Sequence, residues 1–387
     1  MKKQILKLNE ISPIANDSLG DFKLTKDCKE PAAIMLRSYN MHGYDMPESV
    51  LCVARAGAGV NNIPISDCSA KGIVVFNTPG ANANAVKELA ICAMLLASRK
   101  IVDGIEWAGT LKGKGKEVAG LVESGKGSFG GPELTGKKLG VIGLGAIGAM
   151  VANCAVDLDM KVIGYDPHIT VDGAWHLSNS VVHEYDLNRL LSECDFVSLH
   201  VPLTPDTKEM LNKASIAKMK NGAAIINCSR GELVSNAAVV DAIKSGKLSR
   251  YVTDFPVEEL LGVPGIIAIP HLGASTPEAE DNCAIMAARQ SVDFLLNGNI
   301  KNSVNFPSCS IPRTGKQRLT VIHKNVKNVL NAITESVSGA KINIANLLSQ
   351  SQGDYAYAIL DLDDTLPEDV LTKIKAINDI VRVRVIG

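Results

Sequence analysis

The stretch from residue 139 to residue 166 constrains the fold more than any other part of this chain. Apolar residues typical of a buried strand end at Ile142 and are followed by Gly143-Leu-Gly145-Ala-Ile-Gly148 and a helix-forming segment. In such a loop the first glycine permits a tight turn, the second admits a pyrophosphate to the backbone, and the third lets helix and strand pack closely. The pattern therefore predicts a dinucleotide site.

Asp166 indicates which dinucleotide this site takes. It ends the next apolar run, Lys161-Val-Ile-Gly-Tyr165, at the distance from the glycines where an acidic residue meets the ribose. A carboxylate there can accept hydrogen bonds from a ribose 2′-hydroxyl and would repel a 2′-phosphate. We therefore expect NAD rather than NADP.

The composition narrows the functional classes. The chain has 387 residues, 46% of them apolar, which is enough for two or three domains with a sizeable core. A formal net charge of −1 leaves no overall basic field for nucleic acid or an anionic membrane. The nine cysteines are scattered singly, which favours reduced thiols in the cytoplasm, and no metal site is expected. No stretch approaches the roughly 18 apolar residues of a membrane span.

The alternation of short apolar runs with helical patterns is typical of parallel α/β sheets, both before residue 98 and from residue 139 to residue 270. The spacing predicts one long helix over residues 84–105, and the Gly- and Lys-rich residues 113–131 are expected to form an exposed loop. Residues 308–317 read as a linker. Residues 318–387 follow a βαββαβ pattern, typical of a small module that pairs with another copy.

Arg230 and His271 each follow a predicted strand, at the edge where ligands bind in open α/β sheets. Oxidation of a secondary alcohol by NAD needs a base for the hydroxyl proton and, for a hydroxy acid, a cation for the carboxylate. An imidazole suits the first task and a guanidinium fork the second. Asp254, Glu258 or Glu259 could fix the tautomer of the imidazole. Glu258 and Glu259 cannot both do so, since adjacent residues point in different directions.

Residues 30–307 resemble the D-isomer-specific 2-hydroxyacid dehydrogenases. The resemblance is carried by the glycine motif, Asp166, His200-Val-Pro-Leu-Thr204, Cys228-Ser-Arg230-Gly231 and Pro270-His271-Leu-Gly. This resemblance implies an NAD-binding Rossmann domain, residues 99–271, inserted in a flavodoxin-like α/β substrate domain formed by residues 1–98 and 272–307. It places carboxylate binding on Arg230, proton exchange on His271 and pairing with His271 on Glu259, with Glu258 as the alternative.

The same resemblance implies which residues surround the cofactor and the substrate. Those expected at the cofactor are Gly143, Gly145, Ala146, Ile147, Gly148, Asp166, His200, Val201, Pro202, Thr207, Cys228, Ser229, Arg230, Asp254, His271 and Gly273. Those expected at the substrate are Arg37, Ser38, Ala56, Gly57, Ala58, Gly59, Lys87, Arg230 and His271. Arg37 and Ser38 would hold a phosphate end, whereas Lys87 could reach a phosphate or stay in solvent.

Residues 318–387 resemble an ACT domain, a regulatory module that binds amino acids, often between two copies. Joined to this dehydrogenase, it implies oxidation of D-3-phosphoglycerate to 3-phosphohydroxypyruvate, the first step of L-serine biosynthesis, in a homodimer or homotetramer. His323, Asn325 and Asn343 match positions that contact serine as an effector. However, Lys327-Asn328 stands where the effector loop usually has Pro-Gly.

Two other functions remain open from the sequence. One is the same chemistry on another substrate, as in hydroxypyruvate or glyoxylate reductases and D-lactate dehydrogenases. The other is NADH sensing without turnover, as in the C-terminal-binding corepressors. An ACT-like unit argues against the first, and the lack of a long disordered tail argues against the second.

Overall fold

Residues 4–387 are described by the computed structural model, and they form two compact units. We call Ala83–Thr276 the central unit; the flanking unit joins the chain up to Asn82 with Pro277–Gly387. None of the helices within residues 4–387 combines the length and apolar character needed to span a bilayer.

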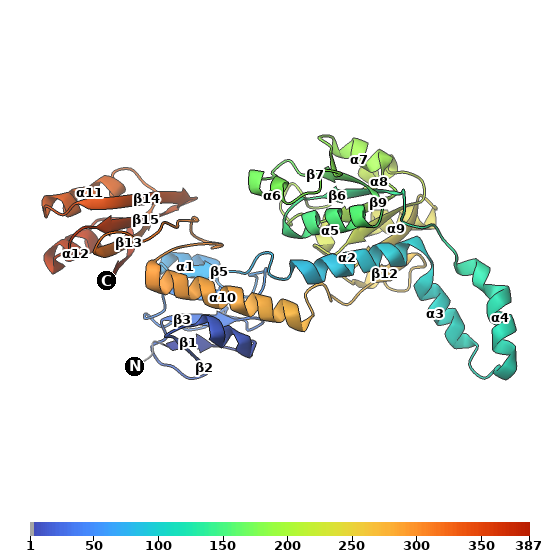
Figure 1. Cartoon of the computed structure of the whole chain (residues 1–387), viewed down its shortest axis with the longest axis horizontal. Helices are drawn as coiled ribbons and strands as arrows, with labels where there is room; N and C mark the ends of the chain where they lie inside the picture. The colour runs from blue at the N-terminus through green and yellow to red at the C-terminus, as the bar shows by residue number, and fades with distance from the viewer. Residues whose placement is uncertain (1–3) are drawn as a thin grey trace. The chain divides into compact units, whose positions relative to one another are not determined.

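A seven-stranded, wholly parallel sheet with the order β12-β11-β10-β9-β6-β7-β8 organises the central unit. Figure 1 draws this unit in colours from cyan to yellow. Its strands are β6 (Lys138–Ile142), β7 (Lys161–Tyr165), β8 (Val182–His183), β9 (Phe196–Leu199), β10 (Ala223–Asn227), β11 (Leu248–Thr253) and β12 (Ile266–Ala268). Its helices are α2 (Ala83–Ser98), α3 (Ile101–Thr110), α4 (Val118–Gly125), α5 (Ala146–Asp157), α6 (Val171–Trp175), α7 (Leu187–Glu193), α8 (Lys213–Lys218) and α9 (Asn236–Lys244).

The inner strands β9 and β10 are buried at every position, because helices cover both faces of the sheet. On one face, α2 packs with α5, and Ala90 and Met94 of α2 share a core with Val141 of β6 and Val151 of α5. The helix α2 therefore belongs to the central unit. The boundary that the contacts give, after Asn82, differs from the predicted one at residue 98.

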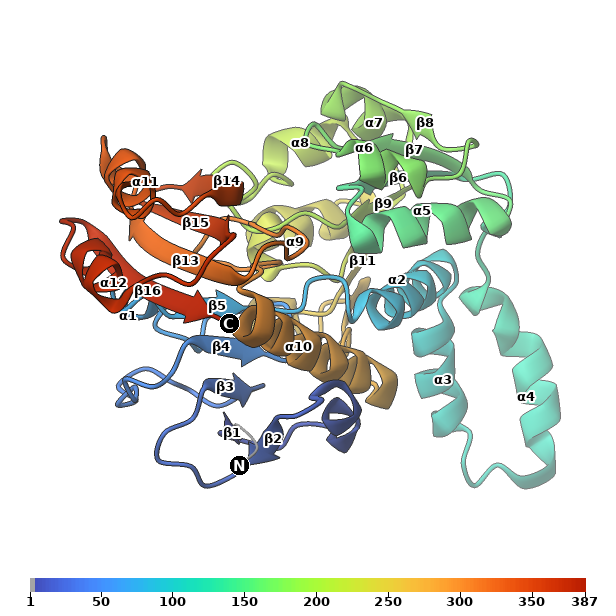
Figure 2. The same cartoon turned by 60° about the vertical axis from the view of Figure 1, so that its left-hand side comes forward.

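The expected helix over residues 84–105 is divided, and the expected loop over residues 113–131 is largely helical. The division lies at Arg99 and Lys100, where Gly131 passes so close that a Cβ on it would lie 2.1 Å from the carbonyl oxygen of Ser98. α3 and α4 then form a helical hairpin (Figure 2), closed by Trp107 against Phe129 with ring centroids 5.1 Å apart. The composition predicted a loop because glycine is frequent in loops. It could not reveal that Trp107 packs on Phe129, since the two residues are distant in the sequence.

The flanking unit contains a five-stranded parallel sheet with the order β2-β1-β3-β4-β5, the flavodoxin-like order. The elements of this part are β1 (Gln4–Lys7), β2 (Lys23–Thr25), β3 (Ala33–Leu36), β4 (Cys52–Arg55), α1 (Ile65–Ala70), β5 (Val74–Phe76) and α10 (Pro277–Asn297). Small residues such as Ala284 and Ala287 let α10 approach the sheet closely, and Phe294 packs on Phe76.

An antiparallel sheet with the order β14-β15-β13-β16 completes the flanking unit. The βαββαβ prediction is matched by β13 (Gln317–Lys324), α11 (Val329–Gly339), β14 (Ile344–Gln352), β15 (Tyr355–Leu362), α12 (Glu368–Lys375) and β16 (Ile380–Ile386). Leu319 and Val321 of β13 share a core with residues of α11 and α12, which lie on one face of the sheet (Figure 2). Ile322, on the opposite face, joins the core that contains Phe294 of α10.

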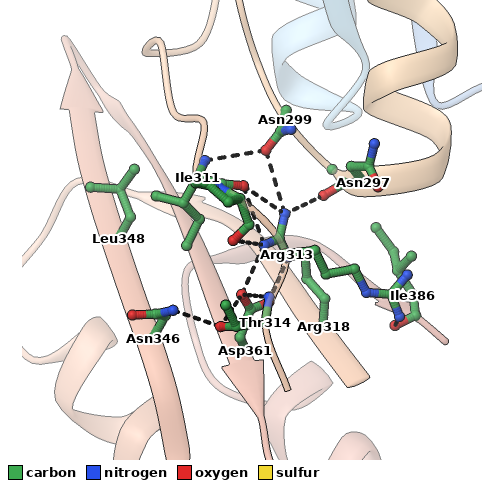
Figure 3. A network of polar contacts seen from close by, with 12 residues as sticks. Asn297, Asn299, Ile311, Arg313, Thr314, Arg318, Asn346, Leu348, Asp361 and Ile386 are labelled. Carbon is green, nitrogen blue, oxygen red and sulfur yellow. Dashed lines mark hydrogen bonds and ion pairs between the residues drawn. The ribbon is translucent and has the colours of Figure 1, made fainter. Parts of the chain in front are cut away.

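The expected linker over residues 308–317 is anchored rather than free. Arg318 and Asp361, both fully buried, form two hydrogen-bonded contacts of 2.6 and 2.8 Å (Figure 3). The same guanidinium donates to the carbonyl oxygens of Asn297 at 2.8 Å and Pro312 at 3.1 Å. Burial alone would raise the pKa of Asp361, but Arg318 and the N–H of Thr314 hold it below its usual value. A buried arginine thus ties the end of α10 and the segment to the antiparallel sheet.

Asp361→Asn should destabilise the flanking unit strongly, because it leaves the Arg318 guanidinium buried without its carboxylate. We expect a loss of about 3–5 kcal/mol in the free energy of unfolding, measured by urea denaturation. Asp364→Asn is the matched control: its pair with Lys316 is exposed, with 69% and 63% of the side chains accessible. It should cost under about 1 kcal/mol. Equal losses in both variants would contradict this account.

Candidate active site

The strand order of the central sheet reverses between β6 and β9, since the chain continues to β7 and β8 on one side and to β10–β12 on the other. Ligands of open parallel sheets bind at the carboxyl ends of the strands at such a point. The glycine loop follows β6, and His200 follows β9. The structure therefore brings these two predicted cofactor segments together.

The three glycines of the motif differ in what surrounds them. Gly143 has a φ of +89°, and a Cβ on it would lie 2.6 Å from the carbonyl oxygen of His200. A Cβ on Gly148 would lie 1.9 Å from the carbonyl oxygen of Gly143. Gly145, which precedes α5, has open space within 4 Å. Crowding thus demands glycine at the first and third positions, while the second leaves room for a pyrophosphate at the helix N-terminus. The loop fits a dinucleotide.

Asp166 holds this loop as well as facing the adjacent cavity. Its carboxylate oxygens accept hydrogen bonds from the backbone N–H of Leu144 at 2.8 Å and of His168 at 2.9 Å. Asp166 also lines a cavity of about 630 Å³ together with Gly145 and Ala146 at the start of α5. Asp166, predicted at the ribose, and Gly145, predicted at the pyrophosphate, therefore line one cavity.

The segment after β9 is fixed by its own polar groups. Burial lowers the pKa of His200 to about 4, so this imidazole is neutral near pH 7. Its Nε2 lies 2.8 Å from the hydroxyl of Ser198, and within residues 4–387 its buried Nδ1 has no partner. The Thr207 hydroxyl donates to the carbonyl oxygen of Pro202 at 2.6 Å. After β10, the Ser229 hydroxyl donates to the carbonyl oxygen of Leu199 at 2.7 Å, which ties two of the predicted cofactor loops together.

A cavity of about 850 Å³ lies at the carboxyl ends of β10 and β11, lined by Gly231, Asp254, Glu259 and His271 among others. His271 has a φ of +55°, and its ring lies 4.9 Å from that of Phe255. Of the two adjacent glutamates, both exposed, Glu259 lines this cavity and Glu258 does not. Position thus favours Glu259 as the acid near His271.

Arg230 is exposed just before this cavity's Gly231, and its Nη1 donates to the carbonyl oxygen of Ser229 at 2.6 Å. Burial raises the pKa of the nearby Cys228 thiol to about 12, so it stays protonated.

Lys87, predicted near a phosphate, lies 3.8 Å from Glu88 in an ion pair, with a fifth of its side chain accessible.

The flanking unit has its own switch point, between β1 and β3, and Arg37 and Ser38 follow β3 there. Asn9, which sequence analysis did not single out, follows β1 and organises both residues. Its Oδ1 accepts from the N–H of Arg37 at 2.9 Å, and its Nδ2 donates to the Ser38 hydroxyl at 3.3 Å. The Arg37 guanidinium pairs with Glu280 of α10 at 2.5 Å. The signal for Asn9 was available, because it follows its strand as Arg37 does.

The loop after β4 is wrapped around Arg55, a second residue that the sequence analysis did not assign. Its guanidinium donates to the carbonyl oxygens of Arg37, at 2.9 Å, and of Gly59. Cβ atoms on Gly57 and Gly59 would lie 3.2 and 3.0 Å from its Nη1, so side chains there would crowd it. Within residues 4–387, the N–H groups of Ala58 and Gly59 have no hydrogen-bond acceptor. These two N–H groups are therefore available as backbone donors to a bound anion.

The three residues predicted to contact an effector are not all brought together. His323 and Asn325 line a cavity of about 290 Å³ in the antiparallel sheet, with Ser349 of β14 on its wall. The side chain of Asn343 instead donates to Asp363 at 2.6 Å.

Gly145→Ala and Gly148→Ala should separate cofactor binding from folding. Gly145 has an ordinary φ of −69° and open space, so alanine should leave the melting temperature within about 2 °C while its methyl obstructs the pyrophosphate. We expect NADH affinity, measured by fluorescence titration, to fall at least tenfold. Gly148→Ala should instead lower the melting temperature sharply, because its Cβ meets backbone. Undiminished NADH binding in Gly145→Ala would contradict the assignment.

Comparison with known proteins agrees with this geometry. The family model of the "D-isomer specific 2-hydroxyacid dehydrogenase, NAD binding domain" matches residues 91–273. A D-3-phosphoglycerate dehydrogenase of Haemophilus influenzae is 35% identical over 382 residues, covering 95% of this chain and 89% of the relative. One of Escherichia coli is 32% identical over 385 residues, covering 95% and 90%.

Among solved structures, the NAD+-bound 3-phosphoglycerate dehydrogenase of Entamoeba histolytica superposes with a TM-score of 0.59 at 26% identity, covering 79% of this chain and 99% of that one. The predicted fold class, an α/β chain with a Rossmann-type NAD-binding sheet, a second parallel sheet of flavodoxin-like order and a separate βαββαβ unit, is confirmed. The chain belongs to the D-isomer specific 2-hydroxyacid dehydrogenases and is an NAD-dependent dehydrogenase.

Proposed function

We propose that this protein oxidises D-3-phosphoglycerate to 3-phosphohydroxypyruvate, the first step of L-serine biosynthesis. The observation that carries the proposal is the similarity, over 95% of the chain, to relatives named D-3-phosphoglycerate dehydrogenase. That span includes the antiparallel sheet as well as the two parallel ones. Arg37 and Ser38, held by Asn9 at the switch point of the flanking unit, support a phosphate-bearing substrate.

In this reaction, NAD supplies the acceptor for the hydride that leaves the substrate carbon. His271 takes the proton of the substrate hydroxyl on its imidazole, and Glu259 stabilises the resulting imidazolium. Arg230 turns its guanidinium from the Ser229 carbonyl to the substrate carboxylate and orients the reacting carbon. In the flanking unit, the N–H groups of Ala58 and Gly59 are further candidate donors to a substrate anion.

We further propose that Arg37 and Ser38 bind the phosphate. Arg37 is available for this because its pair with Glu280 is partly exposed, with 39% and 44% of the side chains accessible. A dianionic phosphate offers Arg37 a stronger partner than one exposed carboxylate does. Lys87 stays a weaker candidate in this proposal, since it already has Glu88 as a partner.

The antiparallel sheet is proposed to be an ACT-like module that also joins two copies of the chain. The cavity beside His323 and Asn325 supports an amino-acid effector, for which serine is the candidate. Asn328 adopts a φ of +68°, a left-handed conformation that asparagine tolerates better than most residues. The effector loop therefore keeps a glycine-like backbone despite Lys327-Asn328. Loss of turnover on adding L-serine would support this role, and an unchanged rate would remove it.

The first test is the production of NADH from NAD and D-3-phosphoglycerate, with the reverse reaction followed on 3-phosphohydroxypyruvate and on hydroxypyruvate. We expect turnover that depends on the phosphate, and Arg37→Ala should raise KM for the phosphorylated substrate at least tenfold while sparing hydroxypyruvate. Turnover of hydroxypyruvate alone would move the assignment to a reductase. NADH binding without any turnover would favour a sensor.

Glu259→Gln and Glu258→Gln form a matched pair that tests the acid beside His271. Because Glu259 lines the cavity that contains His271, its loss should lower kcat by about tenfold or more, since the imidazolium would lose its carboxylate partner. Glu258→Gln, which removes an equal charge one residue away, should leave kcat within threefold. A larger loss in Glu258→Gln would reverse the assignment. Binding of NADH should be unchanged in both variants.

A further inference from the structure

Asn227, the last residue of β10, is fully buried directly beneath the loop that carries Arg230. Its Nδ2 donates to the carbonyl oxygen of Arg230 at 2.8 Å and to the hydroxyl of Tyr251 at 3.3 Å. Its Oδ1 accepts from the N–H of Ser229 at 3.2 Å. Both donors of the amide and its acceptor are thus engaged, and two of these three contacts hold the backbone of the Arg230 loop.

Asp254, which follows β11, holds the His271 loop in a similar way. Only 1% of this residue is accessible. Its Oδ1 accepts from the N–H of Leu272 and its Oδ2 from the N–H of Gly273, both at 2.7 Å. A Cβ on Gly273 would lie 3.0 Å from the same carboxylate, which shows how closely the loop is drawn onto it.

These two side chains are joined through the backbone. The N–H of Asp254 donates to the carbonyl oxygen of Asn227 at 3.0 Å, continuing the pairing of β10 with β11 beyond the sheet. One buried chain of hydrogen bonds therefore runs from the Arg230 loop, through Asn227 and Asp254, to the His271 loop. Groups in such a network are costly to leave unpaired, so it resists displacement of either loop.

His271 needs such support because its backbone is in a poorly populated region. A φ of +55° in a non-glycine residue costs roughly 1–2 kcal/mol, and an unheld loop would relax from it. The side chains of both His271 and Arg230 are exposed, so they have few packing contacts that could fix them. A displacement of about 1 Å in a catalytic group can cost about 10²-fold in rate.

We propose that Asn227 and Asp254 are positioning residues that hold Arg230 and His271 at a fixed spacing. This inference rests on the roles proposed above for Arg230 and His271. Asn227 acts through the residue that binds the substrate carboxylate, and Asp254 acts through the residue that exchanges the proton. The two positions therefore affect different kinetic constants. Sequence analysis placed Asp254 at the cofactor, or beside the imidazole of His271, and these roles can be separated from positioning by experiment.

The test compares Asn227→Ala, Asp254→Asn and the control Tyr251→Phe in steady-state assays with D-3-phosphoglycerate and in NADH titrations. Tyr251→Phe removes one partner of the Asn227 amide while leaving its contacts to the Arg230 loop intact. We expect Asn227→Ala to raise KM at least tenfold with kcat within threefold. Asp254→Asn should lower kcat at least tenfold with KM within threefold. The control should stay within twofold of the wild type.

NADH affinity and the melting temperature distinguish positioning from other causes. Both variants should bind NADH within twofold of the wild type. Weaker NADH binding in Asp254→Asn with an unchanged kcat would assign Asp254 to the cofactor and overturn its role here. Parallel losses of kcat, substrate affinity and NADH affinity would indicate general damage and overturn the proposal for both residues.

If Asn227→Ala does not fold, Asn227→Ser, too short to reach the Arg230 carbonyl, replaces it with the same expectation. A wild-type protein without turnover would instead contradict the proposed function. If instead the wild type and both variants turn over the substrate at the same rate, only the inference about Asn227 and Asp254 is overturned.

Discussion

Parallel pairing of β6, β7, β9, β10 and β11 places all of their carboxyl ends at one edge of the central sheet, and the site depends on this constraint. Segments more than a hundred residues apart, such as the glycine loop and His271, are brought to that edge by strand pairing. Because β9 and β10 are buried on both faces, the register is set by the core and cannot slip without exposing apolar side chains. The chemistry is therefore carried by short loops on a rigid support.

Some polar side chains at this edge form hydrogen bonds to backbone N–H groups of neighbouring loops. Asp166 binds the N–H of Leu144 in the glycine loop, and Asp254 binds the two N–H groups that follow His271. In the flanking unit, Asn9 holds Arg37 in the same manner. Such contacts preorganise a site before any ligand arrives, which limits the reorganisation needed for binding and reaction.

The flanking unit uses one buried and one half-buried arginine for a different purpose, the attachment of its antiparallel sheet. Arg318 joins Asp361 to the end of α10 and to the segment before β13 (Figure 3). Arg384 of β16 donates to the carbonyl oxygens of Phe294 and Leu295, where a cation also complements the negative end of the α10 dipole. Burial lowers the pKa of Arg384 from its usual value, yet a guanidinium stays charged near pH 7.

The sequence by itself determined the features that depend on neighbouring residues. The turn at Gly143, the helix that follows it, the alternation of strands and helices and the βαββαβ order all follow from local patterns of glycine and apolar residues. The family and its cofactor also followed from short motifs, because each motif carries its chemistry within a few residues of a strand end.

Tertiary structure alone decided the features that arise from distant pairs. Gly131 packs against the backbone where the long helix is interrupted at Arg99, and Trp107 packs on Phe129 in the helical hairpin. Arg318, paired with Asp361, anchors the segment before β13. Likewise, Glu259 rather than Glu258 lines the cavity of His271 only because a short helical turn orients the two side chains differently. No local pattern encodes such contacts, since their free energy comes from burying groups that the sequence separates by tens of residues.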